Sequence, residues 1–146
     1  MINIESYWKR FLEDKDLDLN TKCLEAFHFE VTEKLANELL ELVLEGKKRA
    51  TSSSLTEYES ESTVPKIGDY SIVTDWNENP RCVIKTTAVT ILPFKDIDFD
   101  LCKKEGEDDC LETWREGHIK FFTNISKTEF DENMMVVFEE FEVVYK

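Results

Sequence analysis

VPKIGDYSIVTDWNENPRCVIKTTAVTILPF, residues 64–94, is the stretch from which the fold class follows. Pro65 and Gly68 precede a first run of β-branched and aromatic residues. The polar turn NENP separates this run from a second one that begins at Arg81. Two such runs on either side of a polar turn predict a β-hairpin with a longer loop.

Helical patterns lie on both sides of this hairpin. A short amphipathic helix is predicted over residues 5–13, and a longer one in the segment 26–46. In the longer helix Thr32 fits the N-cap and Gly46 the position after the last turn. Its apolar face is predicted to carry four residues, Leu35, Leu39, Leu42 and Val43.

The remainder of the chain returns to helix and then to strand. Residues 98–125 have helical character, and residues 134–145 are β-branched and aromatic. The order predicts one α+β domain over residues 1–146, with a small mixed or antiparallel sheet that could close into a barrel.

Composition favours a globular chain. Apolar residues make up 41% of the 146 positions and aromatic residues 12%. No apolar run approaches the roughly 18 residues that cross a bilayer, and no secretory signal is visible near Met1. We therefore expect a cytoplasmic protein.

The cysteines do not indicate a metal site. None of the four, at positions 23, 82, 102 and 110, belongs to a CxxC pair, and the chain has only two histidines. Structural zinc sites usually show paired ligands at short spacing. We expect reduced thiols, no metal and no cofactor.

The net charge of −14 limits the possible ligands. Binding to a long nucleic acid derives from phosphate neutralisation, usually by a basic face. A chain with 32 acidic and 18 basic residues repels a polyanion at long range. The charge therefore favours a nucleoside, a nucleotide or a short single-stranded RNA over long nucleic acids.

One candidate site follows the second helix, in EGKKRATSSS, residues 45–54. Lys48 and Thr51 are three residues apart, so a tight turn could bring an amine next to a hydroxyl. A lysine with a lowered pKa can activate such a hydroxyl as a nucleophile. On spacing alone, a helix end with a capping threonine is the simpler interpretation.

A second candidate lies in EGEDDCLETWREGH, residues 105–118. Its clustered carboxylates could act as acid and base or hold a divalent cation, although the spacing is not that of an EF-hand. Trp114 and His118 are four apart on the predicted helix and share a face. Trp114 could stack on a base and His118 could move a proton, or both could pack in the core. His28, between two phenylalanines, is interpreted as structural.

Four segments, residues 41–54, 64–89, 105–122 and 134–145, occur in an order and spacing that resembles the ASCH domain family, in particular its longer bacterial branch. The resemblance covers about residues 6–145. It implies a PUA-like fold, a small β-barrel flanked by helices, with a cleft associated with RNA or nucleotides.

The resemblance also implies a set of site residues. The family motif Gly-x-Lys-x-x-[Thr/Glu] matches residues 46–51, which assigns catalytic roles to Lys48 and Thr51. The register of the acidic segment assigns the acid to Glu107, with Glu105 as a substitute. Many relatives carry an arginine where this chain has Ser53.

Three functions remain open from the sequence. The first is an amidohydrolase acting on an acylated nucleoside such as N4-acetylcytidine, in which Lys48 deprotonates Thr51 and Glu107 either orients Lys48 or relays the proton to the leaving amine. The second is a ribonuclease acting on single-stranded RNA that uses His118, or the acidic cluster with a metal ion. The third is a non-catalytic RNA- or nucleotide-binding module. The predicted ligand-binding residues are Lys47, Arg49, Ser53, Glu105, Trp114 and His118.

Overall fold

The computed structural model describes residues 2–30, 32–58, 60–125 and 129–146. Five strands form one mixed sheet in the order β1-β3-β4-β5-β2. They are β1 (Ala26–Phe27), β2 (Ala50–Ser54), β3 (Tyr70–Thr74), β4 (Pro80–Pro93) and β5 (Met135–Tyr145). The α-helices are α1 (Ile4–Asp14), α2 (Glu33–Leu44), α3 (Phe99–Cys102) and α4 (Leu111–Ile125).

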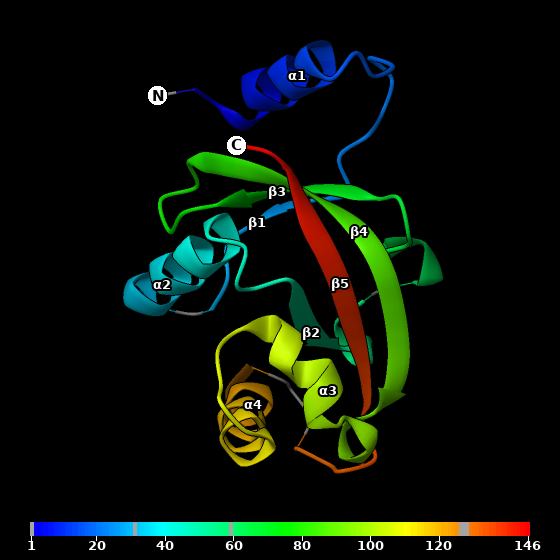
Figure 1. Cartoon of the computed structure of the whole chain (residues 1–146). Helices are drawn as coiled ribbons and strands as arrows, with labels where there is room; N and C mark the ends of the chain where they lie inside the picture. The colour runs from blue at the N-terminus through cyan, green and yellow to red at the C-terminus, as the bar shows by residue number, and fades with distance from the viewer. Residues whose placement is uncertain (1, 31, 59, 126–128) are drawn as a thin grey trace.

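Two long strands organise the sheet. β4 and β5 pair antiparallel and run the length of the molecule as a curved ribbon (Figure 1). β3 pairs with β4 across the turn predicted from the sequence, and β2 adds to the outer side of β5. The edge strands β1 and β2 are not neighbours, so the sheet stays open. The predicted α+β class is confirmed, with a strongly curved sheet in place of a closed barrel.

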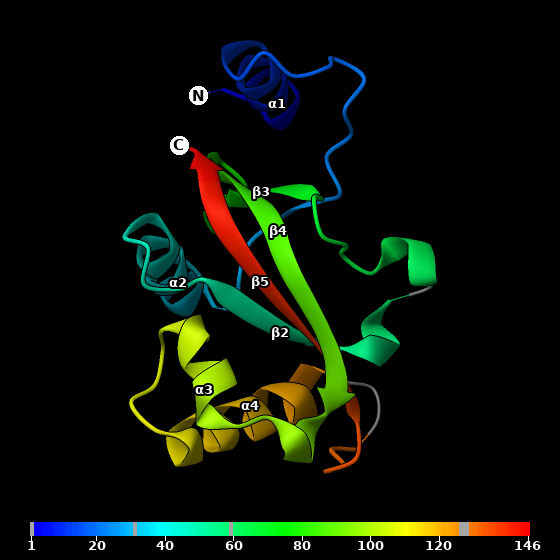
Figure 2. The same cartoon turned by 45° about the vertical axis from the view of Figure 1, so that its right-hand side comes forward.

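The helices cover different parts of this ribbon. α1 lies at the end where β5 finishes, α2 lies beside the sheet, and α3 and α4 lie at the opposite end (Figure 2). Because α1 and α2 pack on opposite faces of β3 and β4, consecutive residues of these strands are buried. Ile72 and Val83 pack with α1, and Val73, Cys82 and Ile84 pack with α2.

The longer predicted helix is present with the expected ends. The hydroxyl of Thr32 accepts a hydrogen bond from the backbone N–H of Leu35, and Gly46 follows the helix with φ = +80°. Its buried face is rotated from the predicted one, however. The buried residues are Ala36, Leu39, Leu40 and Val43, whereas Leu35 is exposed.

Two further findings concern membrane-spanning helices and the cysteines. No helix among the described residues is long and apolar enough to cross a membrane. All four cysteines are free thiols, and Cys82 and Cys102 are buried.

The packing of α1 against the sheet can be tested by mutation. Phe11 is buried against the end of the sheet, so Phe11→Ala should lower the free energy of unfolding by about 3–5 kcal/mol. Leu19 is 62% exposed, so Leu19→Ala should change it by less than about 0.5 kcal/mol. Urea denaturation of both variants measures the difference. Equal stabilities would show that α1 does not pack as described.

Candidate active site

The turn after α2 carries a lysine into the interior. After Gly46, the backbone N–H groups of Lys47 and Lys48 both donate to the carbonyl oxygen of Leu42. The N–H of Arg49 then donates to the carbonyl of Lys104, at 2.8 Å, which aligns this turn with the segment after α3. The turn thus directs the Lys48 side chain inward, where it is 1% exposed.

Every donor of the Lys48 ammonium group is used. Nζ donates to the carbonyl of Ala50 at 2.8 Å, to Glu107 Oε2 at 2.7 Å and to Glu105 Oε1 at 3.4 Å. Burial alone would lower the pKa of Lys48, but the charges of the two glutamates raise it above its usual value. Lys48 is therefore held in its charged form.

Glu105 is the most fully bonded side chain of the site. It is 2% exposed. Oε1 accepts from Lys48 and from His118 Nε2 at 3.3 Å, and Oε2 accepts from Ser52 Oγ at 3.1 Å and Trp114 Nε1 at 2.7 Å. Burial alone would raise the pKa of Glu105, but the charges of Lys48 and His118 lower it to about 2. With about four acceptor sites occupied, this carboxylate has no capacity left for a substrate.

His118 contacts an acceptor with each ring nitrogen. Nδ1 lies 2.9 Å from the carbonyl oxygen of Trp114, and Nε2 faces Glu105. Since both partners accept, both nitrogens have to donate, and only the imidazolium ion has two donors. Burial alone would lower the pKa of His118, but the hydrogen bond and charge of Glu105 raise it. His118 therefore supports the charge on Glu105.

Glu107 is more exposed than Glu105 and makes fewer hydrogen bonds. Its side chain is 20% exposed, and Lys48 is its single hydrogen-bond partner among the described residues. Burial raises the pKa of Glu107, an effect that the Lys48 charge opposes and the Glu105 charge reinforces. Of the two carboxylates, Glu107 is the one able to gain and lose a proton.

Gly106 allows both glutamates to reach the same ammonium group. Its φ of +73° turns the chain sharply between Glu105 and Glu107. A Cβ atom at this position would lie 2.3 Å from the carbonyl oxygen of Lys47. A residue without a side chain is therefore required here by both backbone angle and space.

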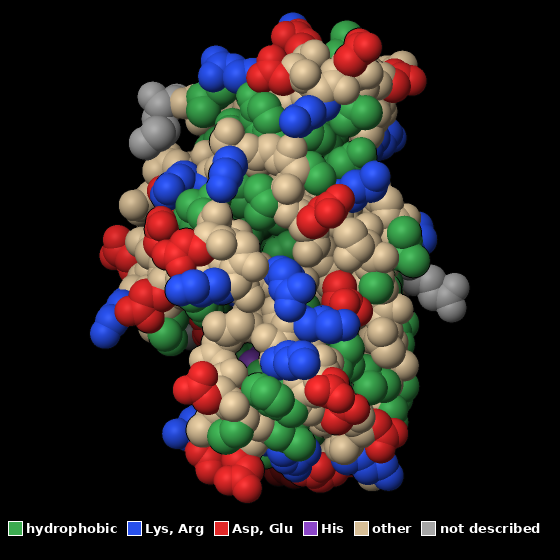
Figure 3. Space-filling model, viewed as in Figure 1, with side chains coloured by type: hydrophobic (Ala, Val, Ile, Leu, Met, Phe, Trp, Pro, Cys, Tyr) green, Lys and Arg blue, Asp and Glu red, His purple; other side chains and the backbone are tan. Residues whose placement is uncertain are grey.

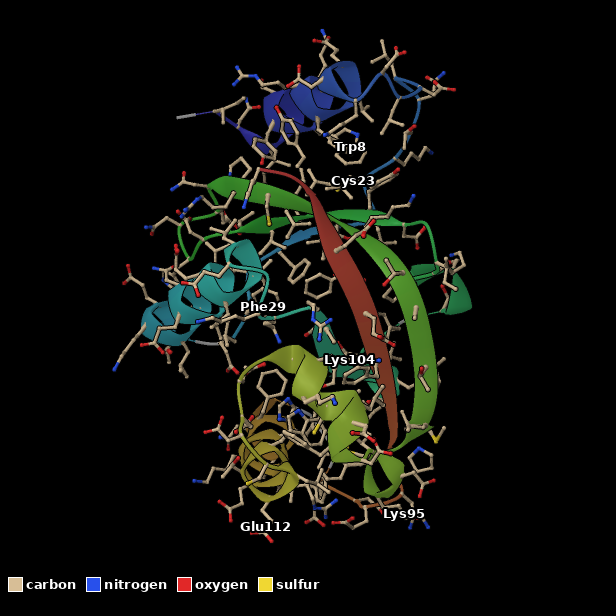
Figure 4. The ribbon with its side chains drawn as sticks, in the orientation of Figure 1. Trp8, Cys23, Phe29, Lys95, Lys104 and Glu112 are labelled. Atoms are coloured by element: carbon tan, nitrogen blue, oxygen red, sulfur yellow. The ribbon has the colours of Figure 1, made fainter. Side chains whose placement is uncertain are left out.

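These charged groups surround a cavity of about 40 Å³. Its walls combine the charged groups with apolar rings, and the Lys48 ammonium lies 5.2 Å from the centre of the Phe29 ring. Phe29 lies between α2 and the sheet (Figure 4). The lining residues are Phe29, Glu30, Leu39, Lys48, Thr51, Ser52, Glu105, Glu107, His118 and Phe121.

The predicted trio of Lys48, Thr51 and Glu107 therefore lines one cavity. Among the described residues, no hydrogen bond joins the Thr51 hydroxyl to Lys48, whose three donors have other partners. The expected action of Lys48 as a base thus does not fit its surroundings. It is placed to supply positive charge.

Four other predicted ligand-binding residues do not line this cavity. Lys47 is exposed and pairs with Glu45, and Arg49 lines a groove on the other side of the turn. Lys and Arg side chains gather near the middle of the face in Figure 3. Lys104 lies beside β5 in Figure 4 and pairs with Glu140 of that strand. Ser53 lines a different cavity, described below.

Trp114 is the fourth, and it has no surface available for stacking on a base. It is 1% exposed, packs on Phe94 and lies 4.1 Å from the His118 ring, centre to centre. Its role is to pack in the core and to donate a hydrogen bond to Glu105.

Sequence reasoning missed several contributors. Ser52 donates to Glu105, and Phe29, Glu30, Leu39 and Phe121 form walls. The alternation of side chains along β2 could have indicated that Ser52 points inward, because it shares a face of the strand with Ala50 and Ser54, which are both buried. No group of three or more His, Cys, Asp or Glu side chains within the described part of the chain is arranged to hold a metal ion.

Comparison with known proteins places this arrangement in a family. The family model described as "ASCH domain" matches residues 25–145. The chain belongs to the ASCH domain family. Its PUA-like fold is thereby confirmed, and residues 48–51 and 105–118 lie within the matched range.

Two solved structures resemble nearly the whole chain. An ASCH domain from Lactobacillus crispatus JV V101 has a TM-score of 0.87 at 30% identity, over 97% of this chain and 94% of that one. Protein EF3133 from Enterococcus faecalis V583 has a TM-score of 0.86 at 32% identity, over 98% of this chain and 93% of that one. No functionally curated protein matches the chain significantly.

Gly106 provides a test of the site's support. Gly106→Ala should lower the free energy of unfolding by at least about 2 kcal/mol, because it combines a left-handed backbone with a collision against Lys47. Gly117, inside α4, has open space around its Cβ position, so Gly117→Ala should stabilise by about 0.5–1 kcal/mol. Urea unfolding compares the two, and an equally stable Gly106→Ala protein would contradict the described turn.

The charge on His118 predicts a pH dependence of stability. Because its pKa is raised in the folded state, His118 stabilises fully below about pH 6.5, and this contribution is lost as pH rises through the raised value. The difference in unfolding free energy between wild type and His118→Gln should therefore be largest near pH 6 and shrink towards pH 9. Urea unfolding of both proteins across this pH range measures the difference. A difference that grows with pH would show that His118 is not protonated in the folded protein.

Proposed function

We propose that this ASCH domain protein is an amidohydrolase that removes an acyl group from a modified nucleoside such as N4-acetylcytidine. The observation that carries the proposal is a buried ammonium group, a titratable carboxylate and a hydroxyl on the walls of one cavity: Lys48, Glu107 and Thr51. The resemblance of these positions to the family's Lys-Thr-Glu set supports the same assignment.

Lys48 would act on the carbonyl oxygen. A fixed positive charge in a site with little water stabilises the oxyanion that forms when an amide carbonyl is attacked. Lys48 meets this requirement because Ala50, Glu105 and Glu107 hold its ammonium group in place. As the substrate oxygen gains charge, it would replace Glu107 as a partner of Nζ.

Glu107 would transfer the proton. It accepts the proton of the Thr51 hydroxyl while the Thr51 oxygen attacks the acyl carbon, and it then gives this proton to the departing amine. The C–N bond breaks and a Thr51 acyl ester remains. A water molecule then cleaves the ester, again with Glu107 as base, and releases the carboxylic acid and the Thr51 hydroxyl.

The surroundings of His118 give less support to a ribonuclease. A ribonuclease would need His118 to exchange protons with a ribose hydroxyl and a phosphate, but both ring nitrogens already have partners. The cavity of about 40 Å³ also suits an acyl group better than a phosphodiester with its nucleosides. Labelled single-stranded RNA should therefore remain intact with or without EDTA.

Glu107→Gln tests the assignment of the base. This change should lower kcat/KM for N4-acetylcytidine by about 10²–10⁴, the range for loss of a general base. In the wild type, kcat/KM should rise with pH through a pKa above 4.5, because only the deprotonated Glu107 accepts a proton. Hydrolysis is followed by chromatography of the released cytidine.

Asp109→Asn is the matched control, since this exposed carboxylate lies outside the cavity lining. It should keep wild-type activity. Thr51→Ala should lose activity, whereas Thr51→Ser should retain part of it. Full activity of Glu107→Gln would exclude the proposed base. Nucleoside binding without any turnover by the wild type would replace the amidohydrolase with a non-catalytic binding module.

A further inference from the structure

A second, larger cavity opens on the sheet next to the candidate active site. Its volume is about 460 Å³, which is within the range of small-molecule sites. The segment before β1, strand β2 and the two short 3₁₀ turns after β2 contribute to its walls. The polar lining residues are Glu25, Ser53, Glu57, Tyr58, Ser62 and Thr63.

Strand β2 contributes side chains to both cavities. Thr51 lines the small cavity and Ser53 lines the large one. Because alternate residues of a strand point to the same face, these two side chains lie side by side, about 7 Å apart. One ligand of nucleoside size can therefore place an acyl group near Thr51 while its other end lies against Ser53.

A buried carboxylate, Glu139, lies on the strand next to Thr51. Glu139 faces Thr51 across the β2–β5 pair and is 8% exposed. One of its oxygens accepts from the hydroxyl of Thr86 at 2.7 Å, and the other has no hydrogen-bond partner among the described residues. Burial raises the pKa of Tyr58, its hydrogen bond with Ser53 lowers it, and the charges of Glu139 and Glu25 raise it.

The described lining is acidic. Glu25 and Glu57 contribute carboxylates and the remaining polar residues contribute hydroxyls, and no lysine or arginine is among the lining residues that the structure describes. Carboxylates accept hydrogen bonds from sugar hydroxyls, as an acidic residue does with the ribose 2′-hydroxyl in dinucleotide sites. They repel a phosphate at the same place.

We infer that this cavity binds the ribose of an unphosphorylated nucleoside through its hydroxyl groups and excludes a 5′-phosphate. The inference rests on the proposed function, because it takes the acyl-bearing base to lie towards Thr51. It narrows the substrate class to free nucleosides, and it assigns Glu25 and Glu57 as residues that determine specificity.

The substrates N4-acetylcytidine and N4-acetylcytidine 5′-monophosphate test the inference. The wild type should favour the nucleoside in kcat/KM by about tenfold or more, equivalent to about 1.4 kcal/mol. Glu25→Gln/Glu57→Gln removes two negative charges from the lining and should lower this ratio several-fold. An unchanged ratio would overturn the assignment.

Glu112→Gln/Glu116→Gln is the matched control for total charge. Both residues are exposed on α4 and lie outside either cavity lining. This variant loses the same two charges, so its ratio should equal that of the wild type. A drop equal to that of Glu25→Gln/Glu57→Gln would mean that the overall field of the protein, and not the cavity, discriminates against phosphate.

Binding separates this inference from the proposed hydrolysis. Cytidine and cytidine 5′-monophosphate contain no acyl group, so calorimetric titration of the wild type measures the cavity without turnover. Tighter binding of cytidine, weakened by Glu25→Gln/Glu57→Gln, would support the inference even if no acylated nucleoside is hydrolysed. Equal or tighter binding of the monophosphate, or no binding of either compound, would overturn it whatever the activity.

Discussion

The ion pair between Lys48 and Glu105 joins the two halves of this molecule. One apolar cluster lies between α2 and the sheet and includes Phe29 and Leu39, and another lies among α3, α4 and the far end of the sheet. Lys48 follows α2, contacts Phe29 and binds Glu105, which in turn holds Trp114 of the second cluster. The relative position of α2 and α4 therefore depends on this contact between buried charges.

Stability alone does not account for such a pair. Removing a lysine and a carboxylate from water costs several kcal/mol, and well-packed apolar residues often replace a buried ion pair without loss. Here the pair continues into a second carboxylate, Glu107, which is partly exposed and incompletely bonded. An arrangement with one saturated and one unsaturated carboxylate on the same ammonium suits proton transfer better than support of the fold.

The sequence predicted the fold well wherever local chemistry determines structure. The turn before Arg81 and the cap at Thr32 both occur as expected. β1 could not be predicted, because it has two residues and exists only through parallel pairing with β3. The predicted buried face of α2 was rotated by a fraction of a turn, since Leu35 is exposed whereas Leu39 and Leu40 are buried.

For the site, the spacing of residues in the sequence identified the segments that carry the reactive side chains. It did not predict the direction in which each side chain points. Lys48 enters the interior while its neighbours Lys47 and Arg49 face solvent, a difference set by the turn after Gly46 and by the contact with Lys104.

Similarly, the alternation along β2 sends Ser52 to Glu105 and leaves Thr51 and Ser53 on the opposite face, each at a different cavity. The excess of acidic residues in the chain is also found locally, in the linings of both cavities. Carboxylates beside Ser53 repel a phosphate, whereas the positive charge of Lys48 is enclosed by two glutamates in the small cavity that Thr51 also lines.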